Sequence, residues 1–459
     1  MRNNNIIYIA LAILAITLFP ACSGTRNCSK PELNLPKSLA GNSTDTITLA
    51  DVEWWKVYTD SALIHIIDET LAFNKDFQIA AAKIEELQQL YGLTASNYFP
   101  EISARLYGNN ETNDYYGKKE VRDPEYGLKA TMSWEIDLWG QLKWARRKGK
   151  ANFEASVEDY RALRVSLIAE AASAYFSLIA LDNELAIVKR TLFTRSENLK
   201  KAKLRFEGGL TPETVYQQAI VECATTEALI PGLEKQIAIQ KNALMLLMGR
   251  YPEQEIARGK LILEQSIPDS IPVGIPSTLL KRRPDIRKSE AQLQAALANV
   301  GVVYADRFPR FSINLTGGLE NDELHNFFQS PFTYILGNIA GSVFDFGRNR
   351  KKHKAAVAQY DQAKLAYEKT VLVAFHEVDN AVTSFAQAKA TSKRRQELRE
   401  AAMKYAQLAY AQYNMGAINY IDVLDAQRRY FDAQIGVSNA TRDEFLALTN
   451  LYKALGGGW

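Results

Sequence analysis

Cysteine and histidine are scarce in this chain of 459 residues, which contains three cysteines and four histidines. Cys22 and Cys28 lie near the N-terminus, and Cys223 lies far from both. Their spacing matches neither a disulfide framework nor a zinc ligand set. Glycine-rich phosphate loops and nucleophile elbows are missing as well. We therefore expect no catalytic residue, no metal site, no cofactor and no enzymatic activity.

An excess of one charge sign is also lacking, because 55 basic residues face 52 acidic ones and the net charge is +3. Nucleic-acid-binding domains usually carry a clear basic excess. The sequence therefore argues against nucleic acid as a partner. Basic clusters at 143–150 and 348–354 follow predicted strands, where they fit either the inner rim of a membrane or a solvated helix face.

Long apolar runs are confined to the N-terminus, where residues 6–19 precede Pro20-Ala21-Cys22-Ser23. This pattern is typical of a signal peptide, and the small residue before Cys22 resembles a lipoprotein signal. Phe19 departs from the leucine expected three positions before the cysteine. We expect removal of residues 1–21 and acylation of Cys22, with plain cleavage as the alternative. Residues 22–60 would then form a lipidated tether.

Proline is absent from about Gln141 to Phe206 and from about Arg348 to Tyr413, and the only glycine there is Gly149. Strong helix formers dominate both stretches. At 1.5 Å per residue, a helix of about 65 residues is roughly 100 Å long. Such helices need lateral partners, and their many alanines favour close packing. Neither stretch has 18 continuous apolar residues, so we do not expect them to span a membrane.

The chain does contain an internal duplication. Landmarks of the first half recur 207 to 209 residues later: Asp76 and Asp285, Phe99 and Phe308, Gly140 and Gly347, Gly209 and Gly416, and Gly249 and Gly456. Each copy is predicted to hold a helix, two strands, a very long helix, a turn and a further helix. We place the repeats at 61–258 and 259–459 and expect them to form one structural unit.

Strand-like alternation follows each Phe-Pro pair, at 102–107 and 311–316. Partner strands are expected at 126–136 and 332–344, after polar loops at 111–124 and 321–331. The length and pattern match strands of an outer-membrane barrel. Since four strands cannot close a barrel and lipid forbids open edges, a membrane role requires several chains. A hairpin pair on a soluble protein is the alternative.

Several motifs together resemble one family. They are Asp137-Leu138-Trp139-Gly140, Arg282-Arg283-Pro284-Asp285, Phe308-Pro309 and the run from Tyr420 to Arg428. The chain resembles the TolC-like outer-membrane efflux family, and within it the lipoprotein outer-membrane factors of RND-type tripartite pumps. The resemblance implies a mixed α and β homotrimer whose twelve strands close one barrel in the outer membrane. It also implies a periplasmic α-barrel tunnel that meets a periplasmic adaptor and an inner-membrane RND-type transporter.

The resemblance also assigns residue roles. Asp422 and Asp425 would line a periplasmic gate as rings of acids, Ile421 would add an apolar constriction, and Tyr413 and Arg428 would hold the aperture shut. The alternative is that Asp422 caps a helix and Asp425 is merely solvated. The first repeat has no such acid pair, so the gate is expected mainly from the second.

Two further groups of residues complete these expectations. Gly208, Gly209 and Gly416 lie in turns that would contact the adaptor, although such glycines also simply end helices. Arg282, Arg283, Pro284, Asp285, Phe308 and Pro309 are expected to shape the fold, because Pro284 and Asp285 suit the first turn of a helix.

The predicted function is a passive outer-membrane exit duct for drugs, metals or other small molecules. Two alternatives stay open. One is the outer-membrane channel of a type I protein-secretion system, and the other is a lipid-anchored periplasmic coiled-coil scaffold without a pore.

Overall fold

The computed structural model describes residues 60–457, except 114–115, 118–120, 253–254 and 265–275, together with residues 28, 31 and 58. The expected signal peptide, Cys22 and most of the tether lie outside the described residues. The chain divides into two compact units. The first includes Lys83–Val157 and Lys288–Lys369, and the second includes Glu158–Arg287 and Thr370–Trp459.

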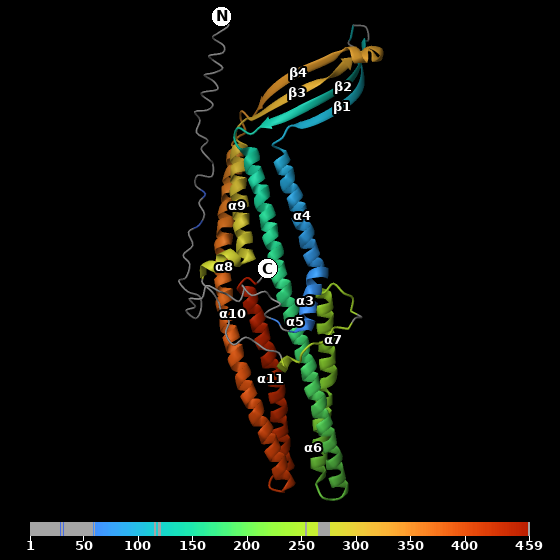
Figure 1. Cartoon of the computed structure of the whole chain (residues 1–459), viewed down its shortest axis with the longest axis vertical. Coiled ribbons are helices and arrows are strands. Elements are labelled where there is room, and N and C mark those ends of the chain that lie inside the picture. Colours follow the sequence, from blue (N-terminus) through green and yellow to red (C-terminus); the bar gives the residue numbers. More distant parts are fainter. Residues whose placement is uncertain are drawn as a thin grey trace. The chain divides into compact units, whose positions relative to one another are not determined.

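Two long helices have the same length and confirm the expected duplication. Helix α5 (Gln141–Glu207) and helix α10 (Arg348–Asn414) each contain 67 residues, and α10 begins 207 positions after α5. Helices α4 (Lys75–Ser96) and α9 (Pro284–Ala305) each contain 22 residues and are 209 positions apart. Both offsets equal those of the sequence landmarks. Figure 1 labels these elements.

The helix after each turn differs between the repeats. In the second repeat α11 (Tyr420–Ala454) runs for 35 residues. In the first repeat the expected single helix is two, α6 (Glu213–Glu227) and α7 (Leu229–Leu247). Pro231 causes this difference, because proline has no N–H and fits only the first turn of a helix. Ser438 occupies the equivalent position of α11. Helices α3 (Ser61–Phe73) and α8 (Pro276–Arg282) and a 3₁₀ turn at Ile262–Glu264 complete the described helices outside the sheet.

The four strands form one antiparallel sheet in the order β1-β2-β3-β4. They are β1 (Glu101–Asn113), β2 (Val121–Ile136), β3 (Arg310–Asn321) and β4 (Pro331–Ala340). The loop expected at 111–124 is too long, because β1 and β2 stay paired as far as Asn113 and Val121. Polar residues extend these strands because the ladder uses backbone groups. The second connection contains a 3₁₀ helix (Leu324–Gln329), and β4 ends at Ala340, before the expected Phe344.

One face of the sheet is apolar across its whole width. Ile102, Met132, Leu315 and Ile335 lie in register on the four strands. The two outer members of this row are very exposed, Ile102 at 74% and Ile335 at 75%. The opposite face carries Ser103, Thr131, Thr316 and Tyr334 in register. Within the described chain β1 and β4 are edge strands, so both an apolar face and two edges are open to partners.

The core of the second unit lies where α5 packs with α3, α7, α10 and α11. Phe176 of α5 stacks on Phe445 of α11 with 4.4 Å between ring centroids, and Figure 1 shows these two helices side by side. One 18-residue window of α5 is apolar enough to cross a membrane, but 61% of it is buried inside the protein. That burial is typical of a core helix.

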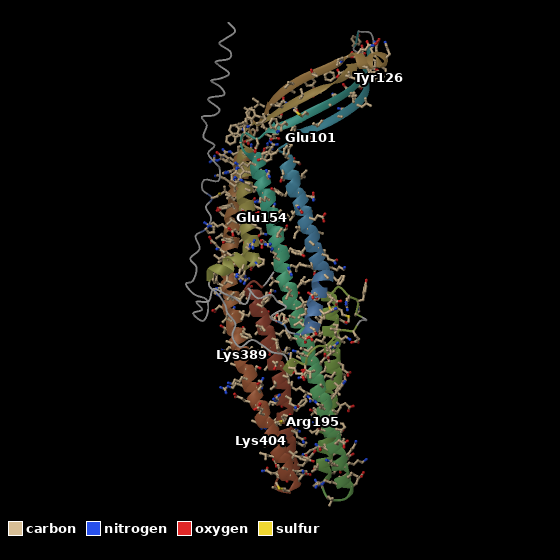
Figure 2. All side chains as sticks on the ribbon, viewed as in Figure 1. Glu101, Tyr126, Glu154, Arg195, Lys389 and Lys404 are labelled. Atoms are coloured by element: carbon tan, nitrogen blue, oxygen red, sulfur yellow. The ribbon has the colours of Figure 1, made fainter. Side chains whose placement is uncertain are left out.

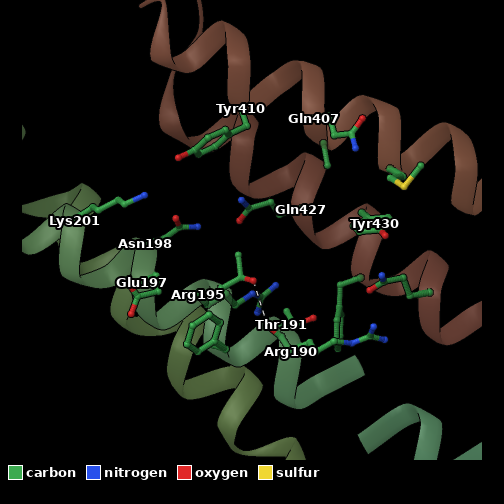
Figure 3. Close-up of a pocket in the computed structure, with 16 residues that line it drawn as sticks. Arg190, Thr191, Arg195, Glu197, Asn198, Lys201, Gln407, Tyr410, Gln427 and Tyr430 are labelled. Atoms are coloured by element: carbon green, nitrogen blue, oxygen red, sulfur yellow. Dashed lines mark hydrogen bonds between the residues drawn. The ribbon is translucent and has the colours of Figure 1, made fainter. Parts of the chain in front are cut away.

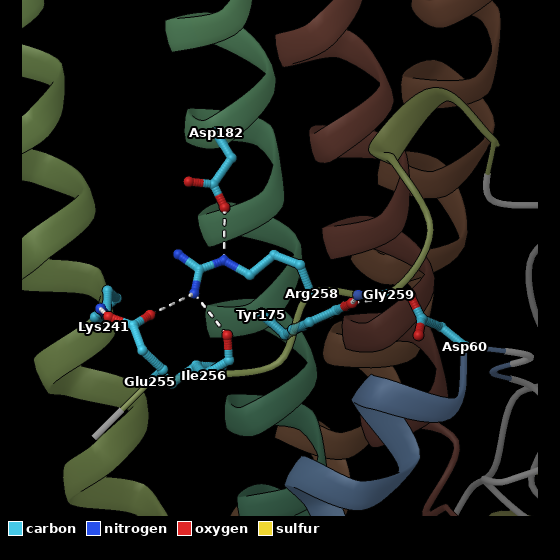
Figure 4. A network of polar contacts seen from close by, with 8 residues as sticks. All are labelled: Asp60, Tyr175, Asp182, Lys241, Glu255, Ile256, Arg258 and Gly259. Atoms are coloured by element: carbon cyan, nitrogen blue, oxygen red, sulfur yellow. Dashed lines mark hydrogen bonds and ion pairs between the residues drawn. The ribbon is translucent and has the colours of Figure 1, made fainter.

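A buried polar network lies beside this core (Figure 4). Asp60 accepts hydrogen bonds from the Tyr175 hydroxyl at 2.8 Å and from the Lys260 backbone N–H at 3.1 Å. The Gly259 N–H donates to the same tyrosine oxygen at 3.0 Å. Asp60 also caps α3 through the Ala62 N–H. The network thus joins the start of α3 to α5 and to the segment after α7.

Candidate gate site

Two tight turns, one in each repeat, connect the long helices to their successors. Gly209 (φ 68°) follows α5 and Gly416 (φ 77°) follows α10. In both turns the N–H of the residue directly after the glycine donates back to the preceding helix: Leu210 donates to Arg205 O at 2.8 Å, and Ala417 donates to Gln412 O at 2.9 Å. Glycine is required there because a positive φ strains other residues. We call α5 with α6 the first hairpin and α10 with α11 the second hairpin.

Gly208, the third predicted turn residue, precedes Gly209 and is exposed. Its N–H donates to Leu204 O at 3.0 Å. A Cβ at this position would lie 3.2 Å from the same carbonyl oxygen, which is a tight contact. Gly208 therefore belongs to the end of α5, and Gly209 provides the reversal.

The two predicted gate acids are held within α11. Asp422 accepts the Asn419 backbone N–H at 3.1 Å and completes a capping box at the start of the helix. Asp425 pairs with Arg429 Nε at 2.8 Å, and both side chains are largely exposed. Ile421 is 55% exposed. Asp422 thus has the capping role that the sequence left open as an alternative, while its charge remains at the tip of the second hairpin.

Tyr413 and Arg428 connect the second hairpin to the first. The Tyr413 hydroxyl accepts a hydrogen bond from Arg205 Nη1 at 2.7 Å, and the Arg205 guanidinium lies 5.5 Å from the centroid of its ring. Arg428 donates from Nε to Glu222 Oε1 at 2.8 Å and makes a second contact from Nη2. Both predicted residues therefore link helices that meet at this end of the second unit.

Sequence reasoning missed a buried ion pair beside these links. Arg195 of α5 and Glu222 of α6 are about 8% and 9% exposed, and Arg195 Nη1 lies 2.9 Å from Glu222 Oε2. Arg195 Nη1 also donates to Thr226 Oγ1 at 2.6 Å. Figure 2 labels Arg195 on α5. The pair joins positions 27 residues apart on two helices, so no local spacing in the sequence indicates it.

Burial and pairing shift two proton affinities in this cluster. Burial lowers the pKa of the Arg195 guanidinium, and Glu222 partly opposes that effect. The hydrogen bond to Glu222 raises the pKa of Arg428. Both arginines remain charged, because arginine titrates far above neutral pH. One carboxylate thus faces two permanent cations.

A groove of about 610 Å³ lies between the two hairpins (Figure 3). Arg195 and Gln427 are part of its wall, together with aromatic and polar side chains of α5, α10 and α11. Nearby, burial raises the pKa of Tyr420 to about 12, so its hydroxyl is neutral at physiological pH. The hairpins are therefore joined by polar links beside this groove.

Arg283 of the predicted signature is buried and binds three elements. It pairs with Asp285 Oδ2 at 2.7 Å and Glu377 Oε2 at 2.5 Å, and it donates to Ala454 O at 2.8 Å. Pro284 is buried as the first residue of α9, and half-buried Arg282 ends α8. The contacts of Arg283 therefore join the start of α9 and the end of α11 to α10.

Phe308 and Pro309 lie in the first unit, between α9 and β3. The Trp139 ring stacks on Phe308 with centroids 4.7 Å apart, and its indole N–H donates to Pro309 O at 2.8 Å. These contacts fix the point at which the chain leaves a helix and enters the sheet.

Known proteins are similar to this chain in sequence and in architecture. The family model for the outer membrane efflux protein matches residues 66–250 and 275–457. The probable outer membrane lipoprotein SilC of Salmonella typhimurium is 30% identical over 98% of each chain. The solvent efflux pump outer membrane protein SrpC of Pseudomonas putida is 30% identical over 88% of this chain and 86% of its own length.

Solved structures agree with these relatives. The open state of the Neisseria gonorrhoeae MtrE outer membrane channel superposes with a TM-score of 0.86 at 25% identity, covering 94% of this chain and 97% of that one. The outer-membrane channel OprN superposes with a TM-score of 0.85 at 26% identity, covering 94% and 99%. The chain therefore belongs to the outer membrane efflux protein family and serves as the outer-membrane duct of an efflux system.

Proposed function

We propose that three copies of the chain form one gated exit duct for small molecules. The sheet carries the proposal, because it has an apolar exposed face and two edge strands within the described chain. Lipid can cover the apolar face, but open edges in lipid leave backbone groups unpaired. Joining β1 of one copy to β4 of the next removes these edges, and three copies provide twelve strands.

The long helices would form a periplasmic tunnel below this barrel. Their second hairpin would supply the gate, with rings of Asp422 and Asp425 and a constriction at Ile421. Acid rings favour cations and disfavour anions. Tyr413 and Arg428 would hold the aperture shut through their links to the first hairpin.

The proposed partners are a periplasmic adaptor, which would meet the turns at Gly208, Gly209 and Gly416, and an inner-membrane RND-type transporter. The duct itself would catalyse no reaction. Cargo would be small molecules, a class that the similarity to SrpC, the outer membrane protein of a solvent efflux pump, supports. We also propose that Cys22 is acylated, as the likeness to a lipoprotein supports.

One experiment distinguishes this duct from its two rivals. The molar mass of the detergent-extracted protein is measured by light scattering, and the protein is then added to a planar lipid bilayer. A mass of three chains and discrete cation-selective currents are expected. A monomer, or a trimer that stays silent after adaptor is added, would favour the scaffold. Restored drug resistance in a deletion strain, without restored protein export, separates efflux from secretion.

A further inference from the structure

Glu222 pairs with two arginines, one from each hairpin. Its Oε2 pairs with Arg195 at 2.9 Å, within the first hairpin. Its Oε1 accepts from Arg428 Nε at 2.8 Å, across to the second hairpin. The Glu222 carboxylate therefore makes one ion pair within the first hairpin and a second ion pair to the second hairpin.

The two arginines also differ in burial and in further partners. The side chain of Arg195 is 8% exposed, whereas that of Arg428 is 54% exposed. Arg195 makes two more hydrogen bonds to α6, to Glu222 O at 3.1 Å and to Thr226 Oγ1 at 2.6 Å. Its guanidinium also lies 5.6 Å from the centroid of the Phe431 ring on α11. Its hydrogen bonds thus all stay within the first hairpin, and Arg428 can be hydrated where it stands.

This asymmetry determines what happens when the hairpins separate. A buried charge left without a partner is strongly unfavourable. If Arg428 moves away, Glu222 keeps Arg195, and Arg428 passes into water. Only a partly exposed ion pair is lost, and such pairs contribute little free energy.

We propose that Glu222 is a positioning residue of the gate, with Arg195 as its permanent partner and Arg428 as its releasable one. The first repeat lacks the acid pair of the second. It supplies Glu222 and Arg195, which stay paired when Arg428 moves away. This inference rests on the proposed gated duct, and it assigns Glu222 and Arg195 a part in it.

Two variants should separate gating from stability, because one should change the open probability and the other the melting temperature. Arg428→Gln removes the releasable partner, so the open probability of the full-length channel in a planar bilayer should rise about five-fold, as expected for loss of roughly 1 kcal/mol. Its melting temperature should change little. Arg195→Gln leaves Glu222 paired with Arg428, so the channel should stay shut while its melting temperature falls clearly.

A double variant tests whether Glu222 and Arg428 act together. Glu222→Gln should open the channel as Arg428→Gln does, and the pair combined should open it no further, because each removes the same link. Glu197→Gln is the matched control, since Glu197 of α5 pairs with Lys200 of the same helix. It should leave open probability and melting temperature unchanged.

Double-mutant cycles of melting temperature keep the proposal falsifiable even if no pore forms. The coupling of Glu222 to Arg195 should exceed its coupling to Arg428. An equal or weaker coupling to Arg195 would overturn the assignment of the permanent partner. Opening by Arg195→Gln as large as that by Arg428→Gln would overturn it too. A wild-type trimer that stays without currents after adaptor is added would instead contradict the proposed gated pore.

Discussion

The first and second hairpins share one backbone and differ in where they keep their charges. Both turn through a glycine with positive φ, and their long helices have equal length. The first hairpin buries one ion pair, that of Arg195 and Glu222. The corresponding part of the second hairpin carries an exposed pair, Asp425 and Arg429. Position 429 is the duplicate of position 222, so an acid in one copy corresponds to a base in the other.

The two copies of a duplicated fold can therefore take different roles. Backbone geometry and turn chemistry are retained because both copies need the same helices. Surface charge is free to diverge, because exposed ion pairs contribute little to stability. The first hairpin can therefore act as a fixed frame, and the second can present acids to the tunnel.

The largest effect is expected at the duplicated positions 222 and 429. Glu222→Ala leaves Arg195 buried without its carboxylate, so it should lower the free energy of unfolding by about 3–5 kcal/mol. Arg429→Ala removes an exposed pair and should cost about 1 kcal/mol or less. Thermal unfolding followed by circular dichroism measures both. Similar losses at the two positions would contradict the difference in burial.

The turn glycines should behave alike in the two hairpins. Gly209→Ala and Gly416→Ala should each cost about 1–2 kcal/mol, because the left-handed region strains a residue with a Cβ. No neighbouring atom lies within 4 Å of the Cβ that either substitution adds. Asparagine at either position should cost less. A much larger loss at only one turn, measured in the same unfolding assay, would show that the turns are not equivalent.

Asp422 allows capping to be separated from charge. Asp422→Ala should cost about 1 kcal/mol through loss of the capping box. Asp422→Asn keeps an oxygen that accepts the Asn419 N–H, so stability should be retained. Both variants remove the charge and should weaken block of the channel by multivalent cations. Full block in the asparagine variant would leave Asp422 only its capping role.

Alkaline pH should produce the smallest effect, through Tyr420. Its pKa is raised to about 12 by burial, so this group's contribution to stability is complete below pH 10 and is lost as pH rises toward 12. The loss should be at most about 1 kcal/mol, because the side chain is partly exposed. Tyr420→Phe should reduce the alkaline decrease in melting temperature. An unchanged pH profile would show that Tyr420 does not titrate in this range.

The long helices were predictable because their signals are local. The predicted ends of α5 and α10 agree with the structure within one residue, since proline is absent between them. Gly149 is the only glycine in these two stretches, and a Cβ there would lie 2.8 Å from Thr94 Oγ1. This glycine therefore permits close approach of α4 to α5.

Contacts between distant helices could not be predicted. Nothing near Arg195 or Glu222 in the sequence shows that they are buried together, because the pairing depends on how α6 packs against α5. The break between α6 and α7 could have been anticipated from Pro231. The residues predicted for the gate came from family resemblance, and the structure adds their partners, Arg205 and Glu222.

The most direct test of this account is block of single-channel current by a trivalent cation added on the periplasmic side. We predict that the wild-type channel is blocked and that the Asp422→Asn, Asp425→Asn double variant conducts with block weakened at least about ten-fold, as expected for losing two rings of fixed charge. Equal block of both proteins would contradict the claim that the second hairpin lines the gate.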